Sequence, residues 1–112
     1  MIKTFKFDDQ NNISEVLLET RVTLAVGDLF YINYNYMLIT KILSNRRGSI
    51  IIDLVRKSSY GKDLYTRKQR LYDMNEVTFS NKHLDLLSPE QIAKIKEEIL
   101  ETLIRSGNIY NG

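Results

Sequence analysis

Short β-prone runs separated by turn-forming residues fill the first 80 residues and constrain the fold more than any other feature. The runs cover residues 2–7, 13–24, 29–33, 36–43 and 49–56. Residues 64–72 are ambiguous between a strand and a loop, and residues 76–80 fit a last short strand. This spacing predicts a mainly β (α+β) fold, a small antiparallel β-barrel or sandwich of about 5–7 short strands with one C-terminal amphipathic helix.

Two of these runs show informative periodicity. Residues 13–24 place one set of side chains at every second position: Val16, Leu18, Thr20, Val22 and Leu24. This period predicts a single extended strand, with a helix over residues 14–20 as the competing interpretation. Residues 49–56 carry apolar side chains on both faces, which predicts a central strand, and Asp53 inside that run requires a partner.

The C-terminal helix, over residues 88–106, is the best-marked element. Ser88 is an N-cap residue, Pro89 follows at the first helical position, and Gln91 completes a capping box. Gly107 is the expected end of the helix. Apolar side chains repeat along one helical face: Ile92, Ile95, Ile99, Leu100, Leu103 and Ile104.

Reactive side chains are sparse. The chain has no cysteine, which excludes disulfides, thiolate metal sites and cysteine nucleophiles. His83 is the one histidine, and we expect it at the surface rather than in a metal site. The glycines are too scattered for a phosphate-binding loop, and no serine stands in a nucleophile-elbow pattern. We therefore expect no enzyme activity, no catalytic residue, no cofactor and no metal. Carboxylate-only catalysis is the enzyme alternative left open.

Positive charge is concentrated in residues 41–70, whereas the segments before and after are net acidic. The basic residues are Lys41, Arg46, Arg47, Arg56, Lys57, Lys62, Arg67, Lys68 and Arg70, and Tyr60 and Tyr65 are interleaved with them. Basic side chains hold phosphates and tyrosine rings stack on unpaired bases, so this block is a candidate nucleic-acid surface. The alternative is that it pairs with acidic neighbours.

A second candidate surface is the tight hairpin predicted at Asn33, Tyr34, Asn35 and Tyr36, because asparagine tolerates positive φ. Tyrosine and asparagine together suit adaptable protein contacts. The alternative is an ordinary hairpin whose tyrosines cap the core. In the tail, Ile109 and Tyr110 are candidate anchors for a neighbouring subunit.

These patterns favour a non-catalytic structural or protein-interaction subunit of a larger homo- or hetero-oligomeric assembly. The first alternative is a nucleic-acid-binding module using residues 41–70. The second is a small inhibitor or regulator of a host protein. Ile, Lys, Asn and Tyr are abundant, which is typical of an AT-rich genome, so a low-GC bacterium or its phage is the expected source.

The length of 112 residues fits one domain over 1–112, with a β-rich body (1–80), the helix (88–106) and a tail (107–112). No apolar run is long enough to span a membrane, and the N-terminal residues lack the apolar run of a signal peptide. We expect a cytoplasmic protein of the producing cell, virion-associated if the source is a phage.

Overall fold

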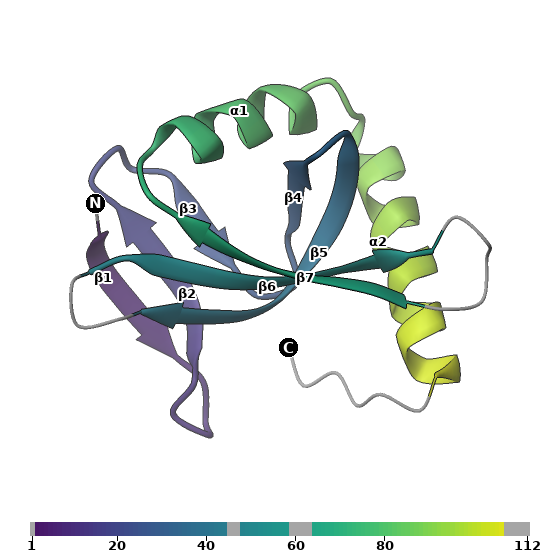
Figure 1. The fold of residues 1–112 in the computed structure, drawn as a ribbon, viewed down its shortest axis with the longest axis horizontal. Coiled ribbons are helices and arrows are strands. Elements are labelled where there is room, and N and C mark those ends of the chain that lie inside the picture. Colours follow the sequence, from purple (N-terminus) through teal and green to yellow (C-terminus); the bar gives the residue numbers. More distant parts are fainter. Residues whose placement is uncertain (1, 45–47, 59–63, 107–112) are drawn as a thin grey trace.

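Seven strands and two helices make up the computed structural model, which describes residues 2–44, 48–58 and 64–106. In chain order (Figure 1) they are β1 (Ile2–Phe7), β2 (Ile13–Leu18), β3 (Thr23–Ala25), β4 (Leu29–Ile32), β5 (Asn35–Ser44), β6 (Ile50–Lys57), β7 (Leu64–Leu71), α1 (Asn75–Leu84) and α2 (Pro89–Arg105).

All strands belong to one antiparallel sheet. The hydrogen-bonded order is β1-β2-β5-β6-β7, with β3 added to β2 and β4 added to β5. The mainly β prediction is confirmed. Within the described residues the strand path ends at β1 and β7, so the sheet is not closed into a barrel by hydrogen bonds. Among the described residues, the ladder between β2 and β5 consists of the single pair Ile13 and Ile42.

The predicted central strand is confirmed as β6, which lies between β5 and β7. Its alternate residues Ile50, Ile52 and Leu54 are fully buried on one face, and Val55 is buried on the other. Asp53 has the partner that its position requires, because the Lys68 Nζ lies 3.1 Å from its Oδ1.

Two hydrophobic clusters form on opposite faces of β5 and β6. The first is closed by β2, β3 and α1, and its buried members are Val16, Leu18, Leu24, Phe30, Met37, Ile39, Ile42, Ile50, Ile52, Leu54, Leu71 and Val77. The second is covered by α2, and its buried members are Leu29, Leu38, Val55, Ile99 and Leu103. The two helices therefore lie at different margins of the sheet, α1 along β4 and α2 beside β5 and β6 (Figure 1).

The single strand predicted over residues 13–24 is wrong. The chain turns between β2 and β3, where Arg21 adopts a positive φ of 65°. Val16 and Leu24 face each other across the resulting strand pair. The period-2 pattern stays in phase through the turn, so the periodicity alone did not show the break.

The strand predicted over residues 76–80 is also wrong, and so is the expectation of a single helix, because this segment lies in α1. Side chains at the start of the helix explain the preference. The Asp73 Oδ1 accepts from the Asn75 N–H at 2.8 Å, and the Glu76 Oε2 accepts from the Asp73 N–H at 3.3 Å. The first bond satisfies one free N–H group of the helix's first turn, and the second ties Glu76 to the segment just before the helix.

The predicted start of α2 is confirmed. The Gln91 N–H donates to the Ser88 Oγ at 3.1 Å, and the Ser88 N–H donates to the Gln91 Oε1 at 2.8 Å. Ile104 is an exception to the predicted apolar face, since 73% of it is exposed. The expected end at Gly107 lies outside the described residues.

Candidate functional site

The turn between β4 and β5 exposes a large aromatic side chain. The two turn residues are Asn33 and Tyr34, with φ values of 50° and 63°, the pair of positive angles that a type I′ turn requires. The Asn35 side-chain amide donates to the Asn33 carbonyl oxygen at 2.7 Å. Tyr34 is 93% exposed. A tyrosine at this second turn position is strained, because glycine is the residue that adopts positive φ without cost.

Four rings pack together at the base of this turn. Tyr31 and Tyr36 are cross-strand neighbours with ring centroids 4.8 Å apart. The His83 imidazole stacks on the Tyr31 ring at 3.9 Å with only 8° between the planes. Phe79 lies 4.5 Å from His83 and 5.9 Å from Tyr31. This ring cluster joins Tyr36 of the predicted hairpin, together with its cross-strand neighbour Tyr31, to α1.

Hydrogen bonds fix α1 against the hairpin. The Tyr31 N–H donates to the buried Ser80 Oγ at 2.9 Å, and the Tyr36 hydroxyl donates to the His83 carbonyl oxygen at 3.1 Å. The His83 Nδ1 lies 2.9 Å from the Phe79 carbonyl oxygen, which can only accept, so Nδ1 is the donor in this bond. The surface histidine expected from the sequence is instead half-buried in the ring cluster.

Beside the ring cluster, β4 and α1 border an apolar groove of about 270 Å³. Its lining residues are Phe30, Tyr31, Ile32, Asn75, Glu76 and Phe79. Phe79 belongs to the ring cluster and is 52% exposed, so part of an aromatic ring is open to solvent at the groove. We refer to Tyr34, Phe79 and this groove as the turn–helix surface.

The hairpin half of this surface was predicted from Asn33 to Tyr36. The sequence patterns did not indicate Tyr31, Phe79 or His83 for this surface, because Tyr31 lies in β4 and the other two lie more than 40 residues further along the chain. A helical reading of residues 75–84 would have placed Phe79 and His83 on one face at i and i+4.

The register divides the described part of the basic block between the two faces of the sheet. Lys41 and Lys68 both lie opposite Asp53, and Arg70 lies opposite Ile51, so these three cations share one face. Lys57 lies further along β6 on that face. A β-bulge between Ile39 and Lys41 turns Lys41 away from the first core cluster.

The other face carries Arg56, Tyr65 and Arg67. Arg56 is opposite Tyr65, with its guanidinium carbon 4.5 Å from the ring centroid, and the Arg67 Nε donates to the Gln69 Oε1 at 3.1 Å. Six further candidates lie outside the described residues: Arg46, Arg47, Tyr60, Lys62, Ile109 and Tyr110.

Among the described residues, no three His, Asp or Glu side chains lie close enough together to bind one metal ion. Neither described helix has the length and apolar character needed to cross a bilayer. Comparisons with protein-family models, with curated proteins and with solved structures find no match for this chain.

Proposed function

We propose that this chain is a non-catalytic interaction subunit of a larger assembly and that the turn–helix surface contacts its protein partner. The observation that carries the proposal is the state of Tyr34. Its side chain is 93% exposed, and its backbone holds a strained positive φ. Strained residues persist where they serve a function, and an exposed tyrosine ring gives a large contact area with only two rotatable side-chain bonds.

The surface favours an apolar protein segment as its partner. The groove at Phe79 accommodates an apolar side chain, and Asn75 and Glu76 at its border supply hydrogen-bonding groups. Hydrogen bonds between the hairpin strands and α1 fix the two elements relative to each other before binding, which lowers the entropy lost on association. Aromatic residues of this kind commonly contribute most of an interface's binding energy.

The test compares two substitutions in the surface with one outside it. We expect Tyr34→Gly and Phe79→Ser each to weaken partner binding by about 2 kcal/mol, roughly 30-fold in Kd. Tyr72→Gly is the matched control, because Tyr72 is also exposed (75%) but lies outside the surface.

Light scattering first shows whether the partner is a second copy of the chain. Affinity capture from the producing cell, followed by calorimetry with each variant, then gives the Kd. Binding that survives both surface substitutions would contradict the proposal, and so would a strictly monomeric chain that captures nothing. Measuring the captured partner's own activity distinguishes an assembly subunit from an inhibitor or regulator.

A nucleic-acid-binding module is the second candidate, supported by the shared face of Lys41, Lys68 and Arg70. Such binding would weaken steeply with salt because each phosphate contact releases counterions. The triple Ala variant of these residues would then bind all sequences more weakly, whereas Arg67→Ala on the other face would not. Absence of binding at low salt would remove this candidate.

A further inference from the structure

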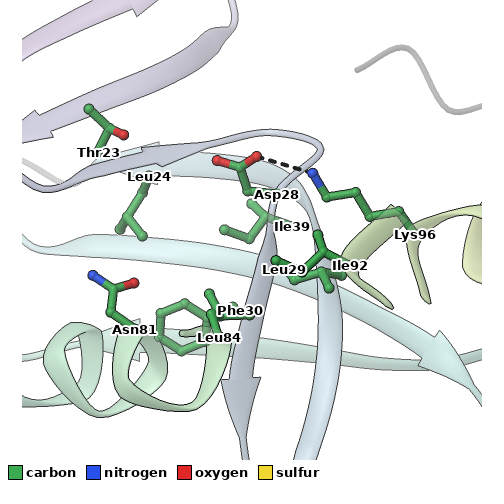
Figure 2. A pocket seen from close by; sticks show the side chains of 10 residues that line it. All are labelled: Thr23, Leu24, Asp28, Leu29, Phe30, Ile39, Asn81, Leu84, Ile92 and Lys96. Atoms are coloured by element: carbon green, nitrogen blue, oxygen red, sulfur yellow. Dashed lines mark ion pairs between the residues drawn. The ribbon is translucent and has the colours of Figure 1, made fainter. Parts of the chain in front are cut away.

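An apolar recess of about 220 Å³ lies where the two hydrophobic clusters meet (Figure 2). Leu24, Phe30 and Ile39 of the first cluster line it together with Leu29, Leu84 and Ile92 of the second or its margin. The remaining lining residues are polar: Thr23, Asp28, Asn81 and Lys96. The recess is therefore a seam between α1, α2 and the sheet that neither cluster fills.

The polar residues leave the recess electrically neutral. The Asp28 Oδ1 and the Lys96 Nζ form an ion pair at 3.5 Å, drawn as the dashed line in Figure 2. Asn81 comes from α1, and its half-buried side-chain amide has no hydrogen-bond partner among the described residues. An amide both donates and accepts, so Asn81 offers a ligand in this recess both a donor and an acceptor.

We propose that this recess binds a small neutral molecule consisting of one ring with a single hydroxyl or amide group. An apolar protein cavity of about 150 Å³ holds benzene, so by proportion 220 Å³ accommodates on the order of ten non-hydrogen atoms. A charged ligand is disfavoured, because it would lose water against apolar walls while the two charges present already pair with each other. Binding would join the two clusters and stabilise the fold.

Apart from Phe30, which lines both, the recess and the groove of the turn–helix surface have different lining residues. The ligand and the protein partner can therefore be tested independently of each other.

The direct test is methyl NMR of the full chain titrated with three probes of similar size: phenol, toluene and benzoate. We expect phenol to bind with a Kd of about 1 mM or tighter and to shift the methyl signals of Leu24, Leu29 and Leu84. Benzoate is expected to bind about tenfold more weakly. Absence of shifts at these methyls at about 10 mM phenol, or benzoate binding as tight as phenol, would overturn the proposal.

Two variants examine the walls of the recess. Leu84→Phe fills the space and should weaken phenol binding about tenfold, whereas the same substitution at Leu86, which is 77% exposed and outside the recess, should leave it unchanged. In the wild-type chain the Asn81 amide should make phenol bind more tightly than toluene. Asn81→Leu should remove this difference in affinity while toluene still binds. Unchanged phenol binding in folded Leu84→Phe, or an unchanged preference in Asn81→Leu, would contradict the assignment. The Asn81 variant and the wild-type titration remain decisive if Leu84→Phe fails to fold.

Discussion

Tyr34 holds a backbone angle that a large L-residue rarely adopts, and its side chain makes little contact with the rest of the chain. Replacing it with glycine removes the strain, although glycine costs some unfolded-state entropy. We expect Tyr34→Gly to raise the free energy of unfolding by about 0.5–1 kcal/mol in chemical denaturation. The same substitution at Tyr72, where the backbone φ is not positive, should give no gain. A destabilised Tyr34→Gly variant would mean that the turn needs this side chain for folding.

At the scale of elements, a buried serine hydroxyl of α1 bonds to the free backbone edge of β4. The Ser80 Oγ, in a residue only 1% exposed, accepts the Tyr31 N–H, which faces away from β5. We expect Ser80→Ala to cost about 1–3 kcal/mol and to speed hydrogen exchange of the Tyr31 amide, because that donor loses its acceptor. Thr78→Ala, at an exposed position of α1, is the control and should change neither quantity. Unaltered exchange at Tyr31 in Ser80→Ala would show that α1 is held by other contacts.

At the scale of the whole molecule, the two hydrophobic clusters share β5 and β6. Leu38 and Val55 face the second cluster, while their chain neighbours Ile39 and Leu54 face the first. Loss of one cluster would therefore destabilise the two strands on which the other cluster also depends, and the chain should unfold in one cooperative step.

Neighbouring residues of α2 test this dependence. Leu103 is 5% exposed in the second cluster and Ile104 is 73% exposed. We expect Leu103→Ala to cost about 2–5 kcal/mol and Ile104→Ala less than about 0.5 kcal/mol. Denaturation followed by circular dichroism and by tyrosine fluorescence should give coincident curves for both variants. Separate transitions would show that the helix and the sheet unfold independently.

Local signals decided which elements could be predicted from the sequence. The start of α2 was predicted correctly because Ser88, Pro89 and Gln91 act within a single turn. At the start of α1 the N-cap residue Met74 makes no side-chain cap bond, and the β-prone residues after it favoured a strand.

Positive φ values at non-glycine residues were the hardest feature to foresee. Arg21 makes the turn between β2 and β3, and Tyr34 makes the turn at the candidate surface. Neither carries the usual turn signal, since glycine and asparagine are the residues that favour this region. The groove and the recess could not be predicted at all, because each forms only when α1 docks on β4.

Photocrosslinking in the producing cell tests whether Tyr34 contacts a protein partner. A photoreactive phenylalanine analogue would replace Tyr34 in one sample and Tyr72 in another, both being highly exposed positions. We predict that position 34 gives a specific crosslink to a protein, either another copy of the chain or a different one, and that position 72 gives none. A crosslink at position 72 without one at position 34 would contradict the account, as would crosslinks to nucleic acid alone.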